Sequence, residues 1–79
     1  MILFPQTVLD ILARGGSIRM SAKGVFPDVM KQYAHAAFAG GGYIEFVVGD
    51  AVLFPQTLSD VTHTGAGHVR WDFVSKIEG

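Results

Sequence analysis

The chain has 79 residues, of which 49% are hydrophobic and 16% are charged, and it contains no cysteine. This length suits one small domain and excludes a deep cleft between two domains, and the missing cysteines exclude a disulfide framework, a thiolate nucleophile and cysteine-rich zinc sites. The formal net charge of -1 lacks the basic excess that nucleic-acid binding normally requires, so we expect no nucleic-acid partner.

The first residues predict no targeting or membrane segment. They have no basic region, and Pro5 and Gln6 interrupt their apolar run, so they do not resemble a signal peptide. The stretch poorest in charge, 34–44, contains His35 and three consecutive glycines and falls short of the roughly 18 apolar residues of a membrane helix. We therefore expect a small cytoplasmic protein without membrane contact. The brevity of the chain and its initiator methionine favour a bacterial or phage origin.

A repeated motif organises the chain. The pentapeptide Leu-Phe-Pro-Gln-Thr occurs at 3–7 and 53–57, and a related Val-Phe-Pro segment begins at Val25. After each Phe-Pro pair come apolar residues at helical spacing, then glycine, then a short alternating segment. This pattern predicts a single domain over residues 1–74 with units at about 3–22, 25–48 and 53–73, followed by a tail at 75–79 that resembles a protease linker.

Each unit predicts a helix that begins at its proline and ends at glycine, because proline needs no N–H partner in a first turn and glycine accepts the left-handed conformation. The residues at three- and four-residue steps that predict a buried stripe are Val8, Ile11 and Leu12, then Met30, Tyr33, Ala34, Ala37 and Phe38, then Leu58 and Val61. We expect Phe4, Phe26 and Phe54 to wedge between neighbouring units.

A strand follows each helix, and its inward residues are apolar: Ile18 and Met20, then Ile44, Phe46 and Val48, then Val69, Trp71 and Phe73. Strands that are joined by right-handed helical crossovers run parallel. The strand order 1-2-3 places the Glu45 carboxylate between Arg19 and Arg70, an arrangement that cross-strand pairing favours. The order 2-1-3 would set the two arginines side by side, where like charges repel. The sequence therefore predicts an α/β fold of three helix-strand repeats with a parallel three-stranded sheet in the order 1-2-3, helices on one face and an open polar face.

This arrangement resembles leucine-rich-repeat and other α/β solenoid proteins in architecture, although the Leu-x-x-Leu-x-Leu-x-x-Asn signature is absent. The predicted edge strands, 17–22 and 68–74, are open to another strand. The second of them is long and carries Trp71 and Phe73, which predicts dimerisation or stacking there. We expect Val69→Pro to abolish such an assembly, since proline removes a backbone donor.

The open face supplies the preferred functional hypothesis. It gathers forked donors, carboxylates and rings that are typical of protein-binding surfaces: Arg19, Tyr43, Glu45, His68, Arg70 and Asp72. The same residues also fit a solvated face with ordinary ion pairs, each worth only about 0–1 kcal/mol. We expect a non-enzymatic protein-interaction or self-assembly module that acts through this open face and an exposed strand edge. Its partner is another protein or a second copy, with a homodimer favoured.

The rim at the carboxyl ends of the strands supplies the alternative, a small binding protein for an anionic ligand. Its candidate residues are Ser21, Lys23, Asp50 and Thr57, with Lys23 as the cation. The glycines match no phosphate-binding motif and are explained by turns.

Catalytic and metal sites are not expected. His35 and His63 share one helix position in their repeats while His68 begins a strand, so convergence on one metal ion is geometrically poor. No catalytic signature surrounds the serines. We expect no cofactor, and a small enzyme stays the less favoured reading.

Overall fold

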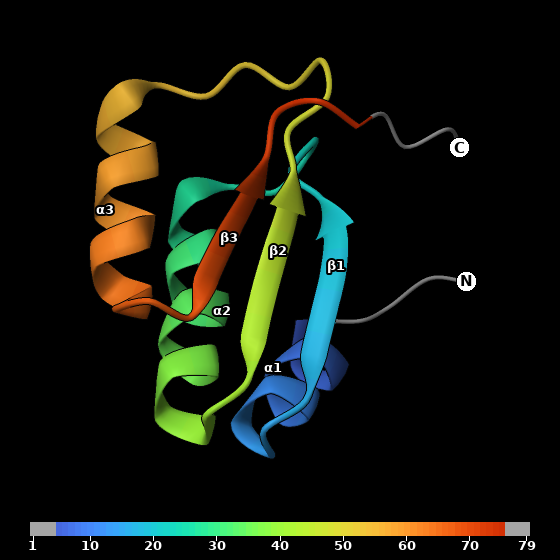
Figure 1. Cartoon of the computed structure of the whole chain (residues 1–79), viewed down its shortest axis with the longest axis vertical. Coiled ribbons are helices and arrows are strands. Elements are labelled where there is room, and N and C mark those ends of the chain that lie inside the picture. Colours follow the sequence, from blue (N-terminus) through green and yellow to red (C-terminus); the bar gives the residue numbers. More distant parts are fainter. Residues whose placement is uncertain (1–4, 76–79) are drawn as a thin grey trace.

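A computed structural model of the chain describes residues 5–75 and shows a helix before a strand three times over (Figure 1). The elements in chain order are α1 (Pro5–Ala13), β1 (Ser17–Ser21), α2 (Pro27–Gly40), β2 (Tyr43–Val47), α3 (Pro55–Gly65) and β3 (Val69–Asp72). The predicted α/β repeat of helix and strand is confirmed. The predictions for Phe4 and for tail residues 76–79 lie outside the described residues.

The strands form one parallel sheet in the order β1-β2-β3, as the sequence predicts. Arg19 lies opposite Glu45, and Glu45 lies opposite Arg70, so the predicted register is also confirmed. The helices of residues 5–75 all lie on one face of the sheet, and none of them lies on the other face (Figure 1). This topology aligns the three repeats side by side, so equivalent residues of each unit meet across the sheet.

The helix ends follow the expected chemistry, with one exception. Phe26 and Phe54 hold extended backbone conformations directly before the prolines that begin α2 and α3. Gly41 ends α2 with a φ of 79°, in the left-handed region that glycine accepts. α3 instead ends at Ala66, which has a φ of 47° and donates its N–H to the carbonyls of Thr62 and His63. The chain there adopts the turn in spite of the strain on an alanine β-carbon.

The core lies between the helices and the covered face of the sheet. Fully buried side chains come from all three helices and from the central strand, namely Leu12, Met30, Ala34, Ala37, Ile44, Phe46 and Val61. The inward residues of the edge strands, Ile18, Met20, Val69 and Trp71, pack against this core while remaining partly exposed. β2 is the best-buried strand because it has a neighbour on each side. No helix within residues 5–75 has the length and apolarity to cross a membrane.

Several residues predicted to be buried are exposed. Phe26 and Phe54 are 75% and 71% exposed, so they do not wedge between units. They precede helices at the carboxyl rim of the strands, where no helix or strand of residues 5–75 covers them. Ile11 and Phe38 also lie at the exposed margin of their helical stripes.

The prediction of a long third strand is also wrong. β3 ends at Asp72 because the Oδ1 atom of Asp72 accepts the backbone N–H groups of Val74 and Ser75, both at 2.9 Å, which turns the chain away from the sheet. Phe73 is therefore outside the strand and 60% exposed. β1 likewise ends at Ser21, one residue before its predicted end.

Candidate functional site

The uncovered side of the sheet, here termed the open face, collects the side chains that alternate away from the helices. The residues that share it are Ser17, Arg19 and Ser21 of β1, Tyr43, Glu45 and Val47 of β2, and His68, Arg70 and Asp72 at β3. All six residues predicted to bind protein are among them. The structure therefore brings the predicted set together on one surface.

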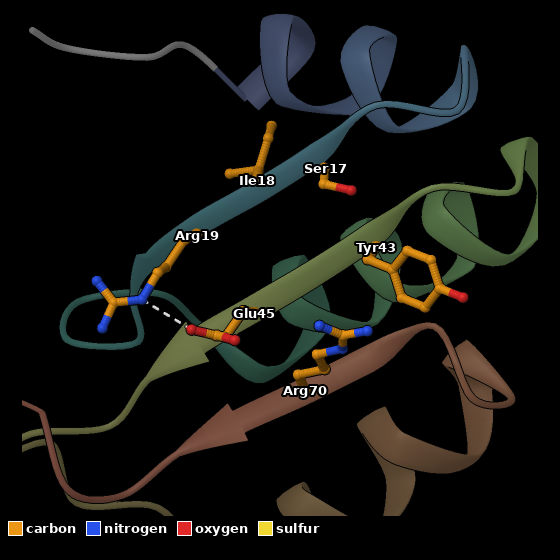
Figure 2. Close-up of a pocket in the computed structure, with 6 residues that line it drawn as sticks. All are labelled: Ser17, Ile18, Arg19, Tyr43, Glu45 and Arg70. Carbon is orange, nitrogen blue, oxygen red and sulfur yellow. Dashed lines mark hydrogen bonds and ion pairs between the residues drawn. The ribbon is translucent and has the colours of Figure 1, made fainter.

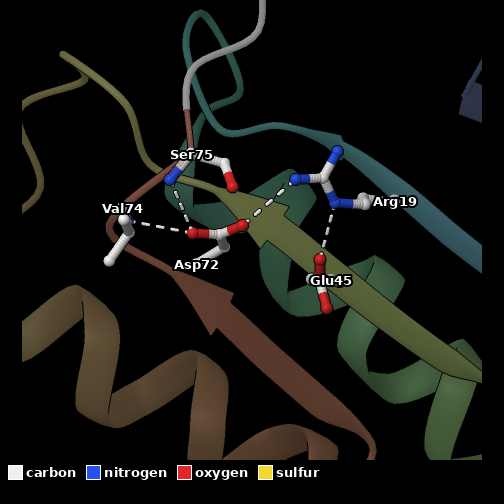
Figure 3. Close-up of polar contacts among 5 residues, drawn as sticks. All are labelled: Arg19, Glu45, Asp72, Val74 and Ser75. Atoms are coloured by element: carbon white, nitrogen blue, oxygen red, sulfur yellow. Dashed lines mark hydrogen bonds and ion pairs between the residues drawn. The ribbon is translucent and has the colours of Figure 1, made fainter.

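Arg19 is the centre of an ionic cluster on this face (Figure 3). Its Nε donates to Oε2 of Glu45 at 2.7 Å, and its Nη2 donates to Oδ2 of Asp72 at 3.1 Å. The hydrogen bond to Glu45, followed by the one to Asp72, raises the pKa of Arg19 above its ordinary value. The Arg19 side chain thus connects the two edge strands across β2. Val47 of β2, which lies opposite Asp72, is only 1% exposed although it points to the open side.

Asp72 is held from two sides. The backbone N–H groups of Ser75 and Val74 and the guanidinium of Arg19 donate to its carboxylate. Hydrogen bonding at Ser75 first, then at Val74 and Arg19, holds the pKa of Asp72 far below its usual range. The charged form is favoured because every one of these donors stabilises it. Asp72 therefore ends β3 and anchors Arg19 at the same time.

A second cluster of rings lies at the amino ends of the strands. The guanidinium carbon of Arg70 lies 4.8 Å from the centroid of the Tyr43 ring, a cation–π geometry. The Tyr43 ring stacks on His68, with centroids 5.1 Å apart. Nδ1 of His68 lies 2.7 Å from the carbonyl oxygen of Gly42, so Nδ1 carries the proton, because a carbonyl only accepts. Phe38 meets the His68 ring edge-on and supports the stack from α2.

A shallow hollow of about 300 Å³ joins the two clusters (Figure 2). The residues that line it are Ser17, Ile18, Arg19, Tyr43, Glu45 and Arg70. Its volume is at the lower limit of ligand pockets, which span about 300–1,000 Å³ and enclose most of their ligand. Because this hollow opens along a sheet surface, it suits one incoming side chain better than an enclosed small molecule.

The two arginines on either side of Glu45 have different partners. The sequence predicts a carboxylate placed between two guanidinium groups, but within residues 5–75 Glu45 pairs with Arg19 and Arg70 makes no ion pair. Arg70 lies against Tyr43 instead, its diagonal neighbour in the ladder. Sequence reasoning missed this stack, although side chains of this length reach diagonal partners in a sheet.

The alternative site at the rim is only partly assembled. Nζ of Lys23 lies 3.6 Å from Oδ2 of Asp50, and both side chains are well exposed, at 69% and 83%. The Oγ of Ser21 accepts the N–H of Lys23 at 3.1 Å. Thr57 lies in the first turn of α3, and no hydrogen bond or ion pair in the described part of the chain joins it to the other three. A carboxylate thus lies beside the cation on which the anion-binding hypothesis depends, and it competes with an anionic ligand for Lys23.

The histidines do not converge. His35 and His63 are exposed on α2 and α3, while His68 belongs to the ring cluster of the open face. Across residues 5–75, no three potential ligands gather as a metal site would require. Comparison with models of protein families, with curated proteins and with solved structures finds no match for the chain.

Proposed function

We propose that the chain is a non-enzymatic protein-interaction or self-assembly module that acts through the open face. One observation carries the proposal: in the described part of the chain, a whole face of an all-parallel sheet bears no helix (Figure 1). All-parallel sheets occur almost only with both faces covered. A second protein surface is the cover that this sheet lacks.

The chemistry of the open face suits such a role. Tyrosine and arginine are enriched at the energetically important positions of protein interfaces, and here Tyr43 and Arg70 lie beside a hollow. Arg19 and Asp72 are already held by intrachain hydrogen bonds. These two side chains lose little freedom when a partner binds, which lowers the entropic cost of association.

A second copy of the chain is the partner we favour. In a symmetric dimer the same patch of each subunit meets its counterpart and must be self-complementary. The charged side chains of the open face, two arginines and two carboxylates, cancel. The four-residue β3, shorter than predicted, makes edge pairing a weaker route to assembly than contact through the face. The cytoplasmic location stays a prediction.

Light scattering over about a hundredfold range of concentration tests the proposal, because association follows mass action. We expect the wild-type mass to rise from that of one copy toward that of two. Ser17→Glu adds bulk and charge at the hollow and removes no side-chain hydrogen bond seen in residues 5–75, so it should shift dimer formation to higher concentration. Ser59→Glu, on the exposed side of α3, is the matched control. A wild type that stays monomeric, or a Ser17→Glu variant that associates like the control, would contradict self-assembly through the open face.

A further inference from the structure

Arg70 is held in place without a counter-ion among residues 5–75. Its side chain is exposed, it makes no ion pair within residues 5–75, and its guanidinium lies over the Tyr43 ring. His68 stacks on Tyr43 and is itself bonded to the carbonyl of Gly42, so the ring beneath the guanidinium is fixed. A planar guanidinium that is oriented in this way is prepared to bind a carboxylate through two parallel hydrogen bonds.

The open face also holds one carboxylate with spare capacity. Both oxygens of Asp72 are occupied, Oδ1 by Val74 and Ser75 and Oδ2 by Arg19. Glu45 accepts the Arg19 hydrogen bond on Oε2, and within residues 5–75 no donor reaches its Oε1. A carboxylate offers about four lone-pair sites, so Glu45 has room for a second guanidinium.

The register of the open face fits a second copy of the same surface. The molecule measures 30 × 29 × 19 Å, and the view down the shortest axis looks onto the open face (Figure 1). The open face therefore lies on a broad side of the molecule. Glu45 and Arg70 are direct neighbours in the ladder. A two-fold axis that passes between them therefore places Glu45 of each copy opposite Arg70 of the other copy. The hollow that both residues line leaves space for the incoming side chain.

We propose that two copies pair through their open faces and that Arg70 of each copy binds the Glu45 carboxylate of the other. This inference rests on the proposed function and identifies the contact that gives the face its specificity. Glu45 then bridges Arg19 of its own chain and Arg70 of the second copy, so the cation without a partner in one chain is neutralised in the dimer.

Neutral substitutions give the first test. Arg70→Gln should raise the dimer dissociation constant by about tenfold or more, the scale of a desolvated charge pair at an interface. Arg14→Gln is the control, because Arg14 is also exposed and also lacks an ion pair within residues 5–75 but lies away from the open face. Its dissociation constant should equal that of the wild type.

Charge exchange between two variants gives the second test. Arg70→Glu places like charges opposite each other in its own dimer, and so does Glu45→Arg, so each variant alone should be monomeric in light scattering. An equimolar mixture should form heterodimers, because both contacts then join opposite charges. Circular dichroism of each variant checks that it is folded. If Glu45→Arg does not fold, the dissociation constant of Arg70→Gln alone tests the Arg70 contact.

The outcomes separate the inference from the function on which it rests. A wild-type dimer that Ser17→Glu disrupts but Arg70→Gln leaves unchanged would overturn the Arg70 contact and keep the open face as the interface. Folded variants whose mixture stays monomeric would also overturn it. A wild type that never associates would remove both self-assembly through the open face and the Arg70 contact.

Discussion

The two sides of strand β2 differ in what covers them. On the helix side, Ile44 and Phe46 are completely buried among side chains of α1, α2 and α3. On the open side, Tyr43 is 39% exposed and Glu45 is half-buried beneath an arginine. Because successive residues of a strand point to opposite faces, one five-residue strand supplies both the centre of the core and the centre of the polar surface. We therefore expect substitutions on the two sides to affect different properties.

The largest effect on stability should come from the covered side. Phe46→Ala removes a fully buried aromatic ring and leaves a cavity, at an expected loss of about 3–5 kcal/mol in the free energy of unfolding. Urea denaturation followed by circular dichroism measures it. If this small domain does not fold after such a loss, Ile44→Val gives the measurement instead, with an expected loss of about 0.5–1.5 kcal/mol. A loss near zero at both positions would show that the covered face is not the core.

The stability of the fold should be sensitive to a single added methyl group at Gly42, directly before β2. A β-carbon at Gly42 would collide with the carbonyl oxygen of Gly16 and come within 3.1 Å of that of Leu12, and backbone atoms cannot rotate aside. We expect Gly42→Ala to cost about 1–3 kcal/mol. Gly41→Ala is the control, since its β-carbon would meet nothing within 4 Å and only the left-handed φ of 79° opposes it, at about 1 kcal/mol. A larger loss for Gly41→Ala than for Gly42→Ala would contradict the close approach of the two loops.

The open side should contribute a smaller stability that depends on pH. The pKa of Asp72 is lowered by its hydrogen bonds in the folded chain, so its charge stabilises the fold above the unfolded pKa of about 3.9. That contribution is lost as the pH falls through the folded pKa. Thermal unfolding of the wild type and Asp72→Asn should therefore differ near neutral pH, by less than Phe46→Ala does, and the difference should shrink below about pH 4. A difference that does not change with pH would show that the charge of Asp72 does not hold the turn.

The smallest effect should come from a phenylalanine on neither side of the sheet. Phe26 is 75% exposed at the rim, so Phe26→Ala should change the free energy of unfolding by about 0.5 kcal/mol or less. The same substitution at Phe46 provides the comparison in the same denaturation experiment. A loss of several kcal/mol at Phe26 would restore the sequence-based prediction that this ring wedges between repeats.

Periodic features of the fold were predictable from the sequence, and features that depend on distant contacts were not. Alternation and helical spacing give the elements, and the charges of Arg19, Glu45 and Arg70 give the strand order. Phe26 was misjudged because an apolar residue is buried only where an element lies over it. The end of β3 was misjudged because an aspartate that accepts N–H groups two and three residues on can stop a strand.

The site was predictable as a set of residues but not as a network. Alternation along the strands places all six predicted residues on the open face. The bond from Arg19 to Asp72 crosses an intervening strand and follows from no local pattern. The stack of Arg70 on Tyr43 likewise depends on which partner Glu45 takes, and that choice needs three-dimensional distances.

The central claim is that the open face is an interface between two copies of the chain, and NMR spectra recorded during dilution test it residue by residue. We predict concentration-dependent shifts for the Nε–H of Arg70 and for the backbone amides of β1, β2 and β3, with the amides of His35 and Ser59 on the exposed helix surfaces unchanged. Shifts confined to the helices or to the rim at Phe26 and Phe54, or spectra that do not change with concentration, would contradict the claim.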